Sequence, residues 1–335
     1  MRFPVSSANC ENCRYWPRPA VWDIVGCWVD QRNRRWGVKR GMGMRDPLVT
    51  IGIPVYNGMP RIEHAIESAR SQTYQNLQIV ISDNGSSDGT DAVCREFAAS
   101  DNRITFLSNA ENLGATRNFN RVYKAGSGTY FKWMGHDDVL DPSAVEKAVA
   151  TLEADPSISV VHWLERIIND EGKVLREYGP SQGFQIDGHS PSQRFRQMLH
   201  WRRLGFAGDP IYGVTRRDAL AQTGLLSSMH NPNYLLLEEL AVAGGISTIP
   251  EILATRVYND VRVTTRKLLR WLDPSSDRSL PHFERAREHL RIGLGAGGSA
   301  TDRVHTAGSL LLYLLQWREL KGLAWDIAEP VRQER

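Results

Sequence analysis

The chain has 335 residues, of which 41% are hydrophobic and 24% are charged, and this composition excludes a disordered, collagen-like or coiled-coil protein. The formal net charge is +3, but residues 1–45 carry nine basic and three acidic side chains, so the remaining chain is nearly neutral. Because a nucleic-acid-binding protein needs a basic surface, we expect no nucleic-acid partner.

The sequence shows neither a secretory signal peptide nor a membrane-spanning segment. The longest apolar run of the C-terminal region, residues 310–315, is far shorter than the roughly 20 residues that a transmembrane helix needs. No apolar stretch follows a positively charged start at the N-terminus. We therefore expect a cytoplasmic protein, and peripheral membrane association remains open.

Residues 1–46 form a basic head segment that differs from the rest of the chain. The head segment holds Cys10, Cys13 and Cys27 and shows no hydrophobic period. Three thiolates fall short of the four ligands of a structural zinc site, and the segment contains no histidine. We favour the alternative that Met42 or Met44 is the true start and that the head segment is not part of the working protein.

Strands and helices alternate between residues 48 and 163. The apolar β-branched runs predict strands at 48–53, 77–81, 104–107, 129–134 and 158–163. Helical spacing of apolar residues predicts the intervening helices at 60–72, 90–99, 114–125 and 142–154. This alternation predicts an α/β fold with a doubly wound, mostly parallel sheet, in which ligands bind beyond the carboxyl ends of the strands.

The alternation ends after residue 163. We expect a hairpin turn at Gly172, helices at 191–201 and 234–243, and strands at 211–215, 246–249 and 252–257. The remaining chain predicts helices at 262–272, 281–294 and 307–320. We therefore expect one domain over residues 47–260, divided into halves at 47–163 and 164–260, and a helical C-terminal extension at 261–335.

Two polar motifs follow the first two predicted strands. Pro54 to Gly58, with the sequence Pro-Val-Tyr-Asn-Gly, offers an aromatic face and an amide for a base or ribose. Ser82 to Thr90 places the Asp83 carboxylate where it could accept a hydrogen bond from a pyrimidine imide. Taken separately, the first motif is also typical of an ordinary turn and the second of a capped loop.

A third motif, His136-Asp-Asp138, follows the fourth predicted strand. Adjacent carboxylates repel each other, and a divalent cation removes that repulsion. Mg²⁺ or Mn²⁺ bound there would keep open positions for phosphate oxygens. The alternative is a helix cap formed by Asp138 or Asp141.

These motifs, followed by Asn112-x-Gly114, Arg117 and Asn118, stand in an order that resembles the family 2 glycosyltransferases from residue 47 to about residue 257. The resemblance implies the GT-A fold and inverting transfer of a sugar from a nucleotide sugar, with a UDP-sugar favoured, to a glycan, lipid or small-molecule acceptor. It also implies a role in polysaccharide biosynthesis and a Mn²⁺ or Mg²⁺ ion at Asp137 and Asp138. The residues implied to bind the nucleotide sugar are Pro54, Tyr56, Asn57, Asp83, Asn84, Ser86, Asn112, Gly114, Arg117, Asn118 and Asp137.

The resemblance implies that residues 47–163 are the nucleotide-sugar donor half and residues 164–260 the acceptor half, and the acceptor half departs from the family pattern. Residues 213–217 and 235–241 match it, but the position of the expected catalytic aspartate is Asn233. An amide cannot take a proton from a hydroxyl near neutral pH. Relatives often carry Arg-x-His after the last strands, whereas this chain has Arg256 and Tyr258 at those positions.

Three side chains could replace the missing base, namely His230, Glu238 and Glu239. We prefer His230, because a partly exposed imidazole has a suitable pKa, whereas the two glutamates are also typical of a solvated helix face. The alternative function is a catalytically impaired nucleotide-sugar-binding protein. A Rossmann oxidoreductase or methyltransferase is disfavoured, because the glycine fingerprint of a dinucleotide site is missing.

Overall fold

The computed structural model describes residues 46–177, 184–203, 210–257, 264–276, 280–316 and 319–326. The chain divides into two units, Met1–Met42 and Gly43–Arg335, and all described residues belong to the second. The expectations for Cys10, Cys13 and Cys27, and for the start of the chain, therefore lie outside the described residues.

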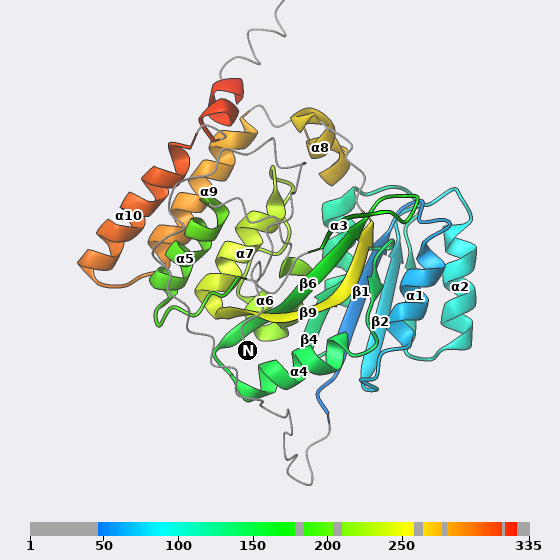
Figure 1. Ribbon diagram of the computed structural model, residues 1–335. Helices are drawn as coiled ribbons and strands as arrows, with labels where there is room; N and C mark the ends of the chain where they lie inside the picture. Colours follow the sequence, from blue (N-terminus) through cyan, green and yellow to red (C-terminus); the bar gives the residue numbers. More distant parts are fainter. Residues whose placement is uncertain are drawn as a thin grey trace, which may run out of the picture. The chain divides into compact units, whose positions relative to one another are not determined.

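The first half of the sheet is parallel, as the alternation predicts. It contains β1 (Val49–Val55), β2 (Leu77–Asp83), β3 (Ile104–Ser108) and β4 (Tyr130–Trp133), in the spatial order β3-β2-β1-β4. The helices between them are α1 (Ile62–Arg70), α2 (Thr90–Ser100) and α3 (Ala115–Ala125), and α4 (Ala144–Ala154) follows (Figure 1). Because every residue of β1 is buried, this strand lies at the centre of the core.

The second half of the sheet mixes directions. β8 (Val214–Arg216) is antiparallel to both β4 and β6 (Ile158–Ile168), and β9 (Gly245–Val257) is parallel to β6. β7 (Val174–Glu177) forms a hairpin with β6, and β5 (Val139–Leu140) pairs with β9. Within the described residues the sheet has nine strands, and most of its paired residues lie in parallel ladders, so the expected α/β fold class is confirmed.

Three expectations for individual elements are wrong in detail. The strands expected at 246–249 and 252–257 are one strand, β9, whose register shifts beside Pro250 because proline cannot donate a ladder hydrogen bond. The strand expected at 211–215 is a short 3-10 helix, Pro210–Tyr212, followed by β8. The last helix, α10 (Ala300–Leu314), begins earlier than residue 307, because Ser299 and Asp302 form a capping box.

Helices from both sides of residue 260 pack into a common cluster (Figure 1). α5 (Pro191–Arg203), α7 (Pro232–Ala243), α9 (Pro281–Gly295) and α10 share a hydrophobic core, with α6 (Arg217–Ala221) before α7. The buried members of that core are Phe195, Leu199, Leu235, Ile292, Leu310 and Tyr313. The described part of the C-terminal extension is therefore packed against helices of residues 164–260 by apolar burial.

The extension also reaches the other half of the domain. The end of α8 (Thr265–Leu272) lies against the start of α3, where a Cβ added to Gly114 would stand 2.6 Å from the Leu272 carbonyl oxygen. Gly114 also has a φ of 87°, which only glycine adopts without strain. Among the described helices, none combines the length and the apolar character that crossing a bilayer requires.

Candidate active site

The loops that follow β1 and β2 are hydrogen-bonded to each other. Asn57 has a φ of 51°, a left-handed conformation that asparagine tolerates. Its N–H donates to Ser86 Oγ at 2.8 Å, and its Oδ1 accepts from the Ser87 N–H at 3.0 Å. Pro54 is buried within β1, whereas the Tyr56 ring is 43% exposed. An aromatic face is thus presented beside a loop pair that is held rigid.

Asp83 is the last residue of β2 and is almost completely buried. Its Oδ1 accepts from the Ser86 hydroxyl, and its Oδ2 accepts from the Ser86 N–H at 3.2 Å. A carboxylate oxygen can accept more than one hydrogen bond, so these contacts orient the Asp83 carboxylate and leave it capacity for a ligand N–H.

A cluster of asparagines joins the loops after β2 and β3 to the start of α3. Asn84 Nδ2 donates to Asn112 Oδ1 at 2.8 Å, and that oxygen also accepts from the Gly114 N–H at 2.9 Å. Asn109 Nδ2 donates to Asn84 Oδ1 at 2.9 Å, while Asn118 donates to a backbone carbonyl at the end of β2. Asn109 was missed by sequence reasoning, although it follows β3 directly, as Asn84 follows β2. Three of these amides, those of Asn84, Asn109 and Asn118, are buried, and together with Asn112 they fix the loops at this edge of the sheet.

Arg117 lies exposed on the first turn of α3, close to the end of α8. The Ser275 hydroxyl, and to a smaller degree the charge of Arg117, hold the pKa of Asp273 below its usual range. Thr116 Oγ1 donates to the Ser227 carbonyl at 3.3 Å, so the loop before α7 also reaches this place. The segment around Arg117 is therefore bordered by α8 and by the loop that leads to α7.

The two adjacent aspartates follow β4 and converge on Gly135. A Cβ there would lie 2.8 Å from Asp138 Oδ2 and 3.0 Å from Asp137 Oδ1. Asp137 is partly exposed, whereas Asp138 is 5% exposed, and burial raises its pKa. Asp138 Oδ2 accepts from the Gly135 N–H at 3.2 Å, and its Oδ1 lies 3.5 Å from Arg256 Nε.

The acidic pair fits a cation that shares its coordination with a second ligand. Within the described ranges, no group of three His, Cys, Asp or Glu side chains could hold a metal ion. Mg²⁺ and Mn²⁺ are commonly bound by one or two carboxylates together with substrate phosphates. Asp137, the more exposed of the two, is the better placed to reach an ion, while Asp138 is already oriented by Gly135 and Arg256.

A buried group of charges lies behind the acidic pair. Lys132 on β4 is fully buried, its ammonium stands 4.7 Å from the Trp163 ring centroid, and burial lowers its pKa to about 8. Arg256 on β9 also pairs with Glu165 on β6 at 3.3 Å. Sequence reasoning missed Lys132 and Glu165; the available signal was a charged residue within an otherwise apolar strand. Together with Asp138, these side chains form a compact set with balanced charge.

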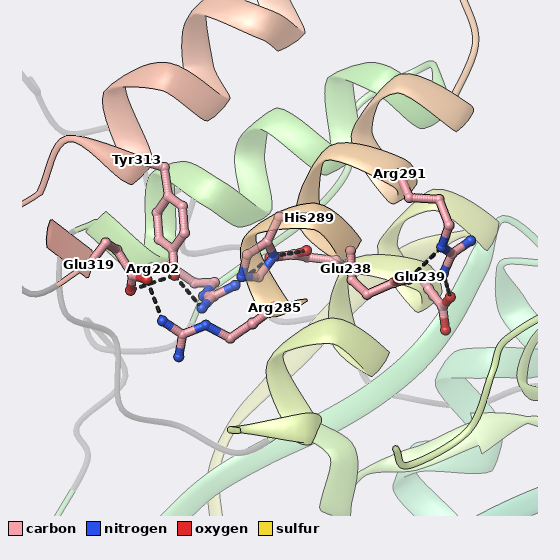
Figure 2. A network of polar contacts seen from close by, with 9 residues as sticks. Arg202, Glu238, Glu239, Arg285, His289, Arg291, Tyr313 and Glu319 are labelled. Carbon is pink, nitrogen blue, oxygen red and sulfur yellow. Dashed lines mark hydrogen bonds and ion pairs between the residues drawn. The ribbon is translucent and has the colours of Figure 1, made fainter. Parts of the chain in front are cut away.

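The four candidate catalytic residues of the acceptor half all lie on α7 or just before it. Asn233 stands on the first turn and is partly exposed. Glu238 is fully buried: its Oε1 accepts from Arg202, and its Oε2 lies 2.6 Å from His289 Nδ1 (Figure 2). Burial opposes ionisation of Glu238, but the charges of His289 and Arg202 hold its pKa below the usual range. A solvated face is therefore the wrong description of Glu238.

Glu239 and His230 are also engaged. Glu239 Oε1 accepts from Arg291 at 2.8 Å (Figure 2), and its Oε2 accepts from the Gly224 N–H at 2.9 Å. His230 Nδ1 lies 2.8 Å from an Arg285 nitrogen, and burial together with the Arg285 charge lowers the pKa of His230 to about 3. His230 is partly exposed, as expected, but the expectation of a pKa suited to a general base is wrong.

Comparison with known proteins gives the family. The sequence model of glycosyl transferase family 2 matches residues 50–224, more than half of the chain. The chain belongs to glycosyltransferase family 2. An uncharacterized glycosyltransferase from Haemophilus influenzae is 37% identical over 130 residues, which are 38% of this chain and 40% of the relative. Chondroitin synthase from Escherichia coli is 29% identical over 227 residues, which are 67% of this chain and 31% of that enzyme.

This family member therefore spans less than half the length of these curated relatives. Among solved structures, S. aureus TarS 1–349 superposes with a TM-score of 0.61 at 13% identity and covers 82% of this chain and 73% of TarS. The mannosyltransferase PcManGT from Pyrobaculum calidifontis gives a TM-score of 0.50 at 18% identity, covering 86% and 76%. These likenesses show the fold, and they confirm the expected GT-A architecture.

Proposed function

We propose that this family 2 member transfers a sugar, with inversion, from a UDP-sugar to a hydroxyl of a glycan, lipid or small-molecule acceptor. The observation that carries the proposal is that Asn57, Asp83 and Asp137 end or follow the neighbouring parallel strands β1, β2 and β4 at one edge of the sheet. TarS has been solved with UDP and with UDP-GlcNAc, and PcManGT with GDP-Man and Mn²⁺. The proposal includes a cytoplasmic location and a role in polysaccharide biosynthesis.

In this proposal the donor half, residues 47–163, holds the nucleotide sugar. Tyr56 stacks on the base, Asp83 accepts a hydrogen bond from the uracil imide, and Arg117 faces the diphosphate. The asparagine cluster defined above keeps these three loops in position. A Mn²⁺ or Mg²⁺ ion held by Asp137 and Asp138 would neutralise charge that develops on the departing diphosphate.

The acceptor half, residues 164–260, together with the extension at 261–335, holds the acceptor. The attacking hydroxyl displaces the nucleoside diphosphate in one step, so the configuration at the sugar carbon inverts. The hydroxyl proton must leave toward a base near the N-terminus of α7. Positioning of the two substrates supplies a large share of the rate in such a reaction.

A nucleotide panel tests the proposal. The full chain is heated with UDP, GDP, CDP or ADP, each with and without Mn²⁺, and its melting temperature is measured. Ligand that binds the native state raises the melting temperature, so UDP with Mn²⁺ should give the largest shift. Equal or absent shifts for all four nucleotides would contradict the assignment of the donor site.

A second candidate function, a binding protein with impaired catalysis, is favoured by the acceptor half. Asn233 occupies the expected base position, and His230, Glu238 and Glu239 each contact an arginine. Asn233→Asp restores a carboxylate on the first turn of α7 and should raise the transfer rate by about 10²–10⁴-fold, as general-base catalysis typically does. Release of UDP from the donor measures that rate.

The matched control is Asn233→Gln, which changes the same position but keeps an amide. It should leave the rate at or below that of the wild type. A gain with both variants would point to an altered helix end instead of a restored base. If neither variant transfers or hydrolyses a donor sugar while UDP still binds, the binding-protein function is the better description.

A further inference from the structure

The described helices enclose a polar cavity of about 150 Å³ beside the first turn of α7. Four nitrogen-rich side chains line it, namely Arg202, His230, His282 and Arg285. The rest of the lining consists of Asn231, which precedes α7, and of Tyr234, Tyr313, Gln316 and Glu319. We propose that this cavity binds an acidic group, a carboxylate or a phosphate, of the acceptor. The inference rests on the proposed transferase function, because it names the chemical class of that enzyme's acceptor.

The two arginines of the cavity have more hydrogen-bond donors than internal acceptors. Each guanidinium has five N–H groups. Among the described residues, Arg202 reaches Glu238 and Tyr313, and Arg285 reaches Glu319 (Figure 2). Arg285 also reaches His230. Arg285 is 4% exposed, and its Nε has no hydrogen-bond partner within the described residues. Donors therefore remain for an oxygen-rich ligand.

Glu238 and Glu319, the carboxylates beside the two arginines, do not supply acceptors for the remaining N–H groups. Glu238 uses one oxygen for Arg202 and the other for His289. Glu319 uses one oxygen for Arg285 and the other for the Tyr313 hydroxyl, which lies 2.9 Å away. A buried guanidinium N–H that lacks an acceptor is costly, and an oxyanion supplies the missing acceptors.

Arg285 acts on both histidines of the cavity. After burial, its charge is the next largest cause that lowers the pKa of both His230 and His282, while Asp326 and Glu319 act on His282 in the opposite direction. The cavity also lies beside the first turn of α7, a helix of twelve residues, and the N-terminal end of a helix dipole favours an anion. The buried Arg285 Nε, which has no hydrogen-bond partner among the described residues, is an observation independent of that helix end.

The cavity lies close enough to the donor edge to hold part of an acceptor. Ser227 contacts Thr116 at the start of α3, and His230 follows Ser227 by three residues, which span at most about 11 Å. A water molecule occupies about 30 Å³ of liquid, so the cavity has room for about five waters, or for one carboxylate or phosphate with its nearest atoms. It is too small for an entire disaccharide.

Anion titration of the full chain tests the proposal. Inorganic phosphate and glucuronate are the two probes, glucose is the neutral control for glucuronate, and binding is followed by calorimetry in the presence and absence of saturating UDP with Mn²⁺. Binding of phosphate represents a phosphate-bearing acceptor, and selective binding of glucuronate represents a carboxylate-bearing one. Glucose should not bind.

Two variants locate the binding. Arg285→Gln removes donors from the cavity, and Asn231→Asp adds a negative charge at its rim without touching the buried ion pairs. Each should weaken anion binding about tenfold or more and leave UDP binding unchanged within about twofold. Asn102→Asp, an exposed position between α2 and β3, is the matched control and should change neither.

The outcomes separate this inference from the proposed function. If UDP binds but neither anion does, or if Asn231→Asp leaves anion binding unchanged, the acidic-acceptor cavity is refuted and the donor site stands. If UDP fails to bind, the transferase function fails, while the anion titration without UDP still tests the cavity. Asn231→Asp keeps the test decisive even if Arg285→Gln does not fold.

Discussion

Glu238→Gln is the substitution that best separates a structural from a catalytic role on α7. Glu238 is 0% exposed and bridges Arg202 of α5 to His289 of α9 (Figure 2). Glutamine keeps the shape of the side chain but removes its charge, so Arg202 loses its buried counter-ion. Removing one partner of a buried ion pair typically lowers the free energy of unfolding by about 3–5 kcal/mol. Glutamine still accepts one hydrogen bond, so the loss for Glu238→Gln should be about 3 kcal/mol.

The adjacent residue supplies the control. Glu239 pairs with Arg291, whose side chain is 59% exposed, and such exposed pairs contribute about 0–1 kcal/mol. Urea unfolding of wild type, Glu238→Gln and Glu239→Gln, followed by circular dichroism, measures the two changes in the free energy of unfolding. A loss for Glu238→Gln no larger than that for Glu239→Gln would refute the structural assignment.

Acid provides a second test of the same reasoning. The pKa of Glu238 is lowered in the folded chain, so its contribution is present above the unfolded pKa of about 4.3 and is lost as the pH falls below that value. The stability difference between wild type and Glu238→Gln should therefore be constant above about pH 5 and shrink in more acidic buffer. A difference that does not depend on pH would mean that the charge of Glu238 is not what stabilises the fold.

Three further predictions concern the donor site, His230 and the head segment. Asp137→Asn and Asp138→Asn should each abolish the extra melting-temperature shift that Mn²⁺ adds to UDP, and an unchanged shift in both would contradict the cation assignment. Because the pKa of His230 is lowered to about 3, the unfolded chain binds a proton there below about pH 6.5 and the folded chain does not. The free energy of unfolding should therefore fall as the pH drops from about 6.5 toward 3. His230→Gln should reduce this fall, as measured by urea unfolding. A protein that begins at Met44 should bind UDP and melt near the full-length temperature, and loss of soluble expression would contradict this.

The parallel half of the sheet was predictable from local signals. β1 and β2 are runs of apolar and β-branched residues, each followed by a polar turn, so their positions follow from residues near in sequence. β5 has two residues and is too short to give a period, and it forms because Val139 and Leu140 meet β9. Tertiary pairing, not local pattern, determines that strand.

The site residues show the same division. Motif spacing was enough to nominate Asn84 and Asn118, but it could not show that both are buried and hydrogen-bonded to neighbouring loops. The loop position of His230 suggested exposure, whereas Arg285, which lies 55 positions later, packs against it and changes its pKa. Contacts between distant segments determined these properties.

The residues that show family membership and the residues around the start of α7 lie largely in different parts of the chain. The matched residues, 50–224, contain the acidic pair and the nucleotide motifs but end before α7 begins at Pro232. The cavity beside the start of α7 is lined partly from outside that match, by His282 and Arg285 of α9, Tyr313 of α10 and two residues after α10, and partly by Arg202 of α5, which lies inside it. A Glu or Arg there can be assigned a role only from its contacts. Under the proposed function, the described part of the extension contributes charge and shape to the acceptor side, so that acceptor choice can change there without any change in the donor motifs.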